Sequence, residues 1–339
     1  MSLPAEGYTQ FTSDLRICRV LNGLWQVSGG HGRIDPQIAI KEMFAYVDAG
    51  FTTWDLADHY GPAEDFIGAF RRQFIAARGA EAWSGVQAFT KWVPRPGRMT
   101  REVVENAVKV SLRRMDVPTL DLLQFHWWDY EDARYLDALK HLADLRDAGK
   151  IRHLALTNFD TEHLRVITEQ GIRVVSNQVQ FSLVDRRPEI AMIPFCRERN
   201  ITLLTYGTVC GGLLSEKYLG QPEPGWRGLN TVSLEKYKMM IDSWGGWSLF
   251  QELLTVLKQI AEKHHVSIAN VAVRYILDRP AVAGVIVGTR LGIAEHRADN
   301  ARPFAFVLDT EDLRQIESVV SKSRDLYQAI GDCGDEYRR

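Results

Sequence analysis

The chain has 339 residues, of which 45% are hydrophobic and 25% charged, proportions that exclude a largely disordered protein. Its 41 basic and 43 acidic side chains give a formal net charge of −2, whereas a nucleic-acid-binding protein usually carries a basic excess. The four cysteines lie far apart, which disfavours a disulfide framework or a metal site and indicates a reducing compartment. The N-terminus lacks a signal-peptide pattern and no apolar stretch reaches membrane-spanning length. We therefore expect a soluble, cytoplasmic protein without nucleic-acid or membrane partners.

Short apolar runs typical of buried strands recur along the chain, separated by amphipathic stretches of helical length. This alternation predicts a parallel sheet covered by helices, and eight strands favour a closed (β/α)8 TIM barrel. We expect a single domain over residues 1–339, with a core from about 15 to 320 and long loops at the C-terminal face. The predicted strands are Val20–Trp25, Thr52–Asp55, Val86–Lys91, Leu120–His126, Ile151–Leu156, Val174–Gln178, Ile201–Tyr206 and Ala283–Val287.

The predicted helices lie between these strands, and one region interrupts the pattern. Segment Leu213–Gly246 is rich in glycine and carries prolines, with tryptophans at 226, 244 and, just beyond it, 247. We interpret it as a long loop that contributes substrate contacts, since loops at the C-terminal face of a barrel usually do so. The predicted helices include Pro36–Ala49, Thr100–Met115, Ala133–Ala148, Thr161–Glu169 and Pro188–Arg199.

Three successive predicted strands end in ionisable side chains: Asp55, Lys91 and His126. Tyr60 follows in the loop after the first of these strands. Any one of these residues alone would be more typical of a solvated or core position. In a (β/α)8 barrel, however, the C-terminal ends of the strands meet at one mouth, where active sites are built. The four side chains are therefore candidates for a common site.

Carbonyl reduction is a chemistry that would use all four groups. Hydride addition leaves negative charge on the oxygen, which needs a proton donor beside it. A nearby ammonium favours a phenolate, so we expect Lys91 to lower the pKa of Tyr60 from its usual value of about 10. Asp55 would keep Lys91 charged, and a neutral His126 would hydrogen-bond the carbonyl and orient it.

These residues also fall within a known signature. The run Asp55-Leu-Ala-Asp-His-Tyr60-Gly61, followed by Glu64 and Gly68, resembles the D-x-A-x-x-Y-G…E…G pattern of aldo-keto reductases. Similar matches run from about residue 15 to 320. The resemblance implies a (β/α)8 barrel that transfers hydride between NADPH and a carbonyl or alcohol. Its catalytic residues here would be Asp55, Tyr60, Lys91 and His126.

The resemblance also implies where the nicotinamide binds. Thr157 and Asn158 occupy the positions that hold the nicotinamide amide, a task shared by Gln178, and Tyr206 matches the tyrosine that stacks on the ring. Two alternatives remain open, because Gln178 would also suit the polar barrel interior and Tyr206 would also suit aromatic packing. The chain departs from the family after this tyrosine, with Gly207-Thr208-Val209 where Ser-Pro-Leu is common.

The predicted phosphate end of the coenzyme site begins directly after the last strand. Arg290 follows Gly288 and Thr289, at the start of a helix expected to run through Ala294–Asn300. Backbone N–H groups at a helix start and a guanidinium together suit a phosphate. We therefore expect NADPH rather than NADH as the coenzyme. The resemblance adds His296 and Asn300 as further contacts, and Arg297 is a rival for the phosphate.

The substrate is expected to be a small-molecule carbonyl compound. Trp25, Trp92, Trp127 and Trp128 are candidate walls of the site, as are the tryptophans of the Leu213–Gly246 region or just past it. Such walls favour aromatic or medium-chain aldehydes over small charged sugars, although packing of the loops is an alternative role for each tryptophan. A second function of a different class is a cofactor-sensing regulatory subunit similar to the potassium-channel β subunits. The sequence leaves the substrate, the preferred direction and the oligomeric state open.

Overall fold

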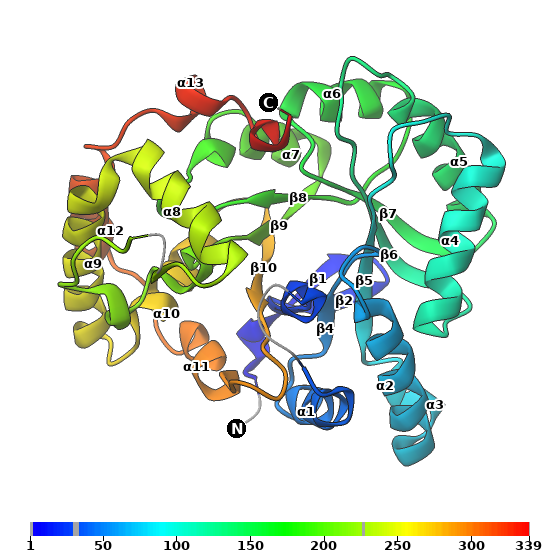
Figure 1. Ribbon diagram of the computed structural model, residues 1–339, viewed down its shortest axis with the longest axis horizontal. Coiled ribbons are helices and arrows are strands. Elements are labelled where there is room, and N and C mark those ends of the chain that lie inside the picture. Colours follow the sequence, from blue (N-terminus) through cyan, green and yellow to red (C-terminus); the bar gives the residue numbers. More distant parts are fainter. Residues whose placement is uncertain (1–2, 30–33, 226–227, 339) are drawn as a thin grey trace.

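The computed structural model describes residues 3–29, 34–225 and 228–338. Eight parallel strands form a closed barrel in the order β10-β3-β4-β5-β6-β7-β8-β9, and helices surround it (Figure 1). The predicted (β/α)8 barrel is thus confirmed. Its strands are β3 (Val20–Gly23), β4 (Thr53–Asp55), β5 (Gln87–Trp92), β6 (Leu120–Phe125), β7 (Ile151–Thr157), β8 (Ser176–Gln180), β9 (Thr202–Tyr206) and β10 (Val282–Gly288).

The helices bury their apolar faces against the outside of the barrel, where they share one large hydrophobic cluster with the outward-facing strand residues. Among the described residues, none of these helices is long and apolar enough to cross a membrane. They are α1 (Pro36–Asp48), α2 (Ala63–Arg78), α3 (Ala80–Trp83), α4 (Arg101–Met115), α5 (Tyr135–Asp147), α6 (Thr161–Glu169), α7 (Met192–Arg199), α8 (Val232–Trp244), α9 (Gly246–Lys263), α10 (Ile268–Leu277), α11 (Arg297–Ala301), α12 (Thr310–Val320) and α13 (Leu326–Ile330).

An N-terminal hairpin closes one end of the barrel. Strands β1 (Tyr8–Thr12) and β2 (Leu15–Cys18) pair antiparallel outside the barrel sheet. Phe11 of this hairpin lies against Phe89 of β5, with ring centroids 5.8 Å apart. Together they belong to a second, smaller cluster of inward-facing apolar residues. The opposite end of the barrel therefore remains as the mouth in which a site can form.

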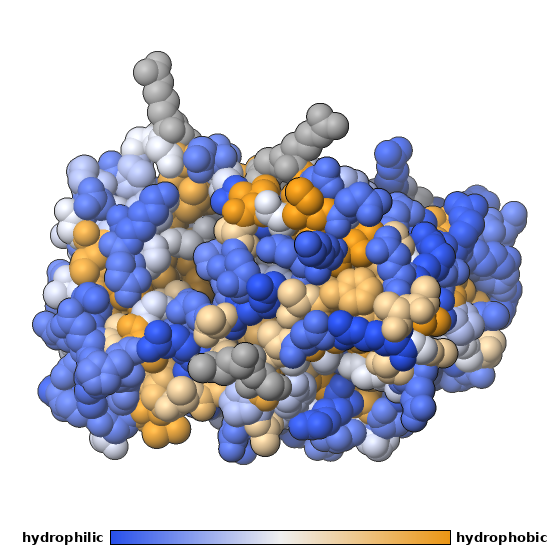
Figure 2. All heavy atoms as spheres, turned by 90° about the horizontal axis from the view of Figure 1, so that it is seen from below, coloured by the Kyte–Doolittle hydropathy of each residue, from blue (hydrophilic) through white to orange (hydrophobic). Residues whose placement is uncertain are grey.

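The alternation of side chains along a strand determines which residues reach that mouth. On β5, Thr90 points outward and donates a hydrogen bond to Glu64 of α2, at 2.7 Å. Its neighbour Lys91 points into the barrel, paired in register with Gln124 of β6. The surface seen in Figure 2 is mostly hydrophilic, with smaller hydrophobic areas between the charged residues. The polar side chains inside the barrel are thus set apart from the solvated exterior.

Most predicted strand boundaries differ from the structure by one or two residues, and one predicted strand and one predicted helix show why. The strand predicted as Val20–Trp25 ends at Gly23, because the Gly23 carbonyl accepts hydrogen bonds from the backbone N–H and hydroxyl of Thr289, and Trp25 opens a 3-10 turn. The helix predicted over Pro188–Arg199 is divided into a 3-10 turn and α7. The break falls at Ala191, whose backbone is not helical.

The segment after β9 is not a continuous loop. Segment Leu213–Gly246 contains the 13-residue helix α8, whose N-terminus is capped by the Thr231 hydroxyl. The helix predicted over Ala294–Asn300 is also shorter and later, since α11 covers only Arg297–Ala301. Before it, the chain turns on itself, with the backbone N–H groups of Ile293 and Ala294 donating to the Arg290 carbonyl.

Candidate active site

A cavity of about 360 Å³ lies at the mouth opposite the N-terminal hairpin. Its walls are the C-terminal ends of the barrel strands together with α8 and the last residues of the chain. All four predicted catalytic residues reach it, and so does most of the predicted nicotinamide site. The predicted site residues that line it are Trp25, Asp55, Tyr60, Lys91, His126, Thr157, Asn158, Gln178, Tyr206 and Gly288.

An ion pair between Lys91 and Asp55 lies at the floor of this cavity. The Lys91 ammonium donates to Asp55 Oδ1 and, at 3.0 Å, to the Leu56 carbonyl. Each side chain is only 4% exposed. Burial of an ion is costly unless its remaining hydrogen-bonding capacity is satisfied, and here the partners supply it. The predicted pairing of Asp55 with Lys91 is therefore what the structure shows.

The second oxygen of Asp55 is held by two glutamines. Gln124 Nε2 and Gln178 Nε2 donate to Asp55 Oδ2 at 2.9 and 2.8 Å, and Gln178 Nε2 also lies 2.6 Å from Gln124 Oε1. Gln178 thus serves the polar interior of the barrel, the alternative left open by its sequence. Gln124 was not among the predicted site residues. Its only sequence signal is a polar residue within the apolar run of β6.

Tyr60 is positioned by α4 and α2. The Arg114 guanidinium donates to the carbonyls of Asp58 and Gly61, on either side of Tyr60, and lies 3.1 Å from the Glu64 carboxylate. A side chain at Gly68 would collide with the backbone of Arg114. The glutamate and the second glycine of the signature therefore act together, because both allow Arg114 to hold the loop that carries Tyr60.

The expected lowering of the Tyr60 pKa is wrong. Burial raises the pKa of Tyr60 well above its usual value, and the negative charge of Asp55 raises it further. Lys91 lies 5.3 Å from the centre of the tyrosine ring, but its charge is offset by the adjacent Asp55 carboxylate. Burial also lowers the pKa of Lys91, which Asp55 opposes. Tyr60 is therefore a protonated phenol beside a neutralised ion pair.

His126 presents an unpaired ring nitrogen to the cavity. Its Nδ1 lies 3.1 Å from the Thr157 carbonyl, and because a carbonyl only accepts, the proton of the neutral ring belongs on Nδ1. Burial and the charge of Arg338 lower the pKa of His126 to about 3, so the ring is neutral. The buried Nε2 atom has no hydrogen-bond partner among the described residues. This tautomer accepts a hydrogen bond from a hydroxyl, rather than donating one to a carbonyl as expected.

The nicotinamide side of the cavity is built around Asn158 and Tyr206. Asn158 has a positive φ of 57°, and its Oδ1 accepts a hydrogen bond from the Tyr206 hydroxyl at 2.8 Å. Gly207 replaces the serine common in the family because the space for a side chain is filled by the Tyr237 ring, 2.7 Å from a Cβ placed there. An amide, an aromatic ring and a strand end without a side chain at Gly288 suit a nicotinamide nucleotide.

The predicted phosphate contacts lie outside this cavity. Thr289 is buried, and its hydroxyl donates to the Gly23 carbonyl at 2.8 Å. Arg290 and His296 are exposed. Arg290 lies well before α11, whereas His296 is the N-cap residue of this helix and makes no side-chain cap hydrogen bond. Arg297 itself forms an ion pair with Glu295. The predicted phosphate site combined a helix start with the Arg290 guanidinium, and only this guanidinium remains as a candidate. Asn300 lies within α11 and does not line the cavity.

The predicted tryptophan walls are only partly correct. Trp25 lines the cavity, as does the half-exposed Trp128, but Trp92 and Trp127 do not. Trp92 packs against Phe125, and the Trp127 indole donates to the Asp129 and Asp132 carbonyls, so both rings stabilise the loops behind the site. Two further tryptophans of the α8 region, 244 and 247, are buried in the core, and Trp226 lies outside the described residues.

Lys236 and Tyr337 are among the cavity residues that the sequence analysis did not find. Lys236 comes from α8, and Tyr337 comes from the last residues of the chain. The Tyr337 hydroxyl lies 3.0 Å from that of Tyr206, and the rings of Tyr337 and His126 are 6.2 Å apart. No spacing pattern links these positions to the strand ends, so only the folded chain brings them together.

A profile of the Aldo/keto reductase family matches residues 19–321, most of the chain. The chain belongs to the aldo/keto reductase family. It is similar to the Bacillus subtilis aldo-keto reductase YhdN, with 26% identity over 90% of each chain. It is also 33% identical to flagellar radial spoke protein 5 of Chlamydomonas reinhardtii, over 72% of this chain and 52% of that one. The Gluconobacter oxydans glycerol dehydrogenase structure shares the fold, with a TM-score of 0.76, 23% identity and coverage of 94% and 96% of the two chains.

Membership in the family establishes the class of chemistry. The protein is an oxidoreductase of the aldo/keto reductase family, whose members use nicotinamide coenzymes. The convergence of Asp55, Tyr60, Lys91 and His126 on one cavity gives this aldo/keto reductase an arrangement in which a proton donor, an ion pair and a hydrogen-bond acceptor face the same space.

Proposed function

We propose that this aldo/keto reductase interconverts a carbonyl compound and an alcohol by hydride transfer with NADPH, and that Tyr60 is the general acid. The observation that carries the proposal is that Tyr60 lines one cavity with the Lys91–Asp55 pair and with His126, whose buried Nε2 has no hydrogen-bond partner among the described residues. We also propose that the whole chain acts as one catalytic unit in the cytoplasm. The four described cysteines are free and buried, which agrees with a reducing compartment.

A nicotinamide coenzyme bound in this cavity would supply the hydride. Asn158 and Tyr206 would hold its nicotinamide, the first through its amide and the second through its ring. As negative charge develops on the substrate oxygen, the Tyr60 hydroxyl donates its proton to that oxygen. An alkoxide is a much stronger base than a phenolate, so the raised pKa of Tyr60 keeps the donor protonated without preventing the transfer.

His126 would act at the alcohol end of the reaction. With its proton on Nδ1, the neutral ring offers Nε2 as an acceptor, and the hydroxyl of an alcohol is a donor that matches it. Lys91 would stabilise the phenolate left on Tyr60 after proton donation, since its ammonium lies 5.3 Å from the ring centre. In this proposal Tyr60 transfers the proton, His126 orients the alcohol and Lys91 stabilises the phenolate.

The preference for NADPH rests on Arg290. Its guanidinium is exposed two residues beyond Gly288, the residue at which β10 leaves the cavity. A guanidinium pairs well with a phosphate, and a 2′-phosphate is the group that distinguishes NADPH from NADH. The proposed preference for NADPH is therefore supported by the Arg290 side chain and by the resemblance to the family.

Steady-state turnover tests the proposed function. The protein should oxidise many equivalents of NADPH per active site when it is supplied with a panel of aromatic and medium-chain aldehydes. A cofactor-sensing regulatory subunit would instead bind NADPH tightly and complete at most a slow single turnover. Absence of repeated turnover across the panel, with NADPH binding intact, would overturn the enzymatic assignment in favour of that alternative.

A further inference from the structure

Lys236 places a second ammonium in the cavity, in addition to that of Lys91. It comes from the second turn of α8, and its Nζ atom lies over three tyrosine rings. The distances to the ring centres are 4.5 Å for Tyr337, 4.9 Å for Tyr206 and 5.5 Å for Tyr237. Its hydrogen-bond partner is the hydroxyl of Tyr337. An ammonium in this position is attracted by the faces of the aromatic rings.

The contrast with neighbouring lysines makes this arrangement unusual. Lys238, two residues further along α8, forms ion pairs with Glu223 and Asp242. Lys91, the other ammonium among the described residues that line the cavity, is paired with Asp55. Within the described part of the chain, Lys236 forms no ion pair. Partial burial of an uncompensated cation costs free energy, and an anion brought by a ligand would relieve that cost.

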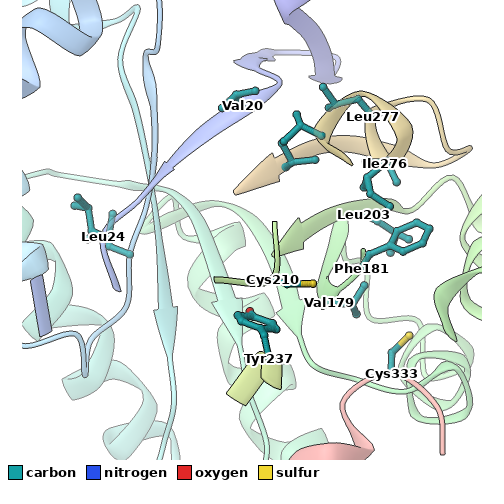
Figure 3. Packing of buried hydrophobic residues seen from close by; sticks show 14 of the residues in the cluster. Val20, Leu24, Val179, Phe181, Leu203, Cys210, Tyr237, Ile276, Leu277 and Cys333 are labelled. Carbon is teal, nitrogen blue, oxygen red and sulfur yellow. The ribbon is translucent and has the colours of Figure 1, made fainter. Parts of the chain in front are cut away.

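The C-terminal segment holds Tyr337 at this position. Cys333 packs in the same hydrophobic cluster as Val179 and Phe181 (Figure 3). On the other side of Tyr337, the Arg338 guanidinium lies 3.8 Å from the centre of the Tyr130 ring and donates to the Trp127 carbonyl at 2.8 Å. Tyr337 is thus anchored from both sides. Its hydroxyl gives Lys236 a neutral partner that a charged ligand oxygen could replace with a stronger bond.

We propose that Lys236 binds a carboxylate or phosphate group of a ligand that fills the catalytic cavity. The inference rests on the proposed function, because it assigns an anionic group to a ligand of that same site. The Tyr337 ring is close to both groups: its centre lies 4.5 Å from the Lys236 Nζ atom and 6.2 Å from the centre of the His126 ring. An aldehyde with an acidic group at its far end would place its carbonyl beside Tyr60 and its anionic group beside Lys236. A phosphate of the coenzyme is the other candidate source of an anionic group for Lys236.

The test uses a matched pair of aldehydes and a direct binding measurement. 4-Carboxybenzaldehyde carries the anion, and methyl 4-formylbenzoate has the same ring without the charge. Lys236→Met keeps the apolar stem and removes the ammonium, whereas Lys236→Arg keeps the charge. We expect Lys236→Met to lower kcat/KM for the carboxylate roughly 10- to 100-fold and to leave the ester unchanged, and Lys236→Arg to preserve the preference. The Kd of NADPH, followed by its fluorescence, should then stay unchanged.

Other outcomes distinguish a substrate anion from a coenzyme phosphate, and both from failure of the proposal. Equal losses for both aldehydes, together with a similarly weakened Kd for NADPH and NADH, would assign Lys236 to a coenzyme phosphate. Unchanged aldehyde preference and unchanged coenzyme binding in Lys236→Met would overturn the proposal. Lys109→Met, on the exposed face of α4, is the control for loss of one positive charge. If the unmodified protein reduces no aldehyde of the panel, including these two, the proposed function fails, while the NADPH binding arm still tests Lys236.

Discussion

At the residue scale, the proposed mechanism assigns proton donation and the carrying of charge to different residues. The Lys91 ammonium is neutralised by Asp55, so it does not make Tyr60 acidic in advance. Tyr60 instead keeps its proton until a strong base forms beside it. The charge that Lys91 offers becomes useful only when the phenolate appears, which is a property of the transition state rather than of the resting site.

Replacement of Tyr60 by phenylalanine should remove the proton donor and keep the ring. We expect Tyr60→Phe to lower kcat for carbonyl reduction roughly 10²- to 10⁴-fold, with the Kd of NADPH little changed. Measurement of kcat and of the Kd of NADPH on the same preparation tests this prediction. Tyr218→Phe, outside the cavity, is the matched control, and near-native turnover by Tyr60→Phe would show that the proton comes from another group.

The pH dependence should differ between the two directions. A group whose pKa is raised stays protonated to higher pH, so Tyr60 remains a competent acid throughout neutral conditions. The pKa of His126 is about 3, so its ring does not titrate near pH 6.5. We expect kcat/KM for reduction to stay nearly constant from about pH 5 to 9, and alcohol oxidation to rise at alkaline pH as the phenolate forms. A loss of reduction with an apparent pKa near 6.5 would assign a titrating role to His126.

At the scale of the elements, the position of Tyr60 depends on a helix that never enters the cavity. Arg114 lies in the last turn of α4 and reaches across to the loop that follows β4, where it holds the carbonyls of Asp58 and Gly61. Glu64, at the start of α2, fixes the guanidinium from the other side. The loop is thus oriented by two helices of the outer ring.

Removal of Arg114 should misplace Tyr60 without touching substrate or coenzyme. We expect Arg114→Met to lower kcat roughly 10-fold or more, because small displacements of a proton donor are costly, while the Kd of NADPH changes little. Arg113→Met, the exposed neighbour on α4, should retain kcat. A purely structural role would instead lower Tm and leave kcat per folded molecule unchanged, which thermal unfolding alongside kinetics would reveal.

The turn between β10 and α11 carries the prediction on coenzyme choice. Loss of a charge-assisted contact is worth about 1.5–3 kcal/mol, so Arg290→Ala should weaken NADPH roughly 10-fold or more. The Kd of NADH, which lacks the 2′-phosphate, should barely change and serves as the internal control. Equal weakening of both coenzymes in fluorescence titrations would remove Arg290 from the phosphate site.

At the scale of the whole molecule, the chain end is part of the barrel mouth. In Figure 1 the C-terminal segment ends beside α6, in agreement with a 2.8 Å hydrogen bond from the Thr161 backbone, at the start of α6, to Asp332. The guanidinium of Arg187 joins this segment to the region after β8, through ion pairs with Asp185 and Glu336. Burial opposes the charge of Arg187, but these carboxylates raise its pKa.

Arg187→Met should therefore destabilise the protein, because it leaves the nearly buried carboxylates of Asp185 and Glu336 without their partner. Breaking a buried ion pair from one side costs about 3–5 kcal/mol of the free energy of unfolding. Urea denaturation measures this loss. Arg199→Met, which removes an exposed pair with Glu198, should cost about 1 kcal/mol or less. Similar losses for the two variants would show that the chain end is only loosely coupled to the barrel.

The sequence by itself determined the barrel and the residues at the ends of its strands. Eight apolar runs separated by amphipathic helices specify parallel strands, and parallel strands that close into a barrel all end at one mouth. Asp55, Lys91 and His126 could be predicted as neighbours for that reason alone, since each lies at the end of such a run. Local turn chemistry was less informative, because the helix expected at Ala294 starts only at Arg297.

The tertiary structure decided which groups surround these residues, and with them the electrostatics. Gln124 is a polar residue within a mostly apolar strand, so its contact with Asp55 is not evident from the sequence. Lys236 lies in α8 and Tyr337 near the end of the chain, and no sequence pattern links either residue to the strand ends. Trp92 and Trp127 face the packing behind the site, because side-chain direction depends on register and loop path. The raised pKa of Tyr60 likewise follows from burial and from the compensation of Lys91 by Asp55, which depend on distances that arise only when remote segments pack together.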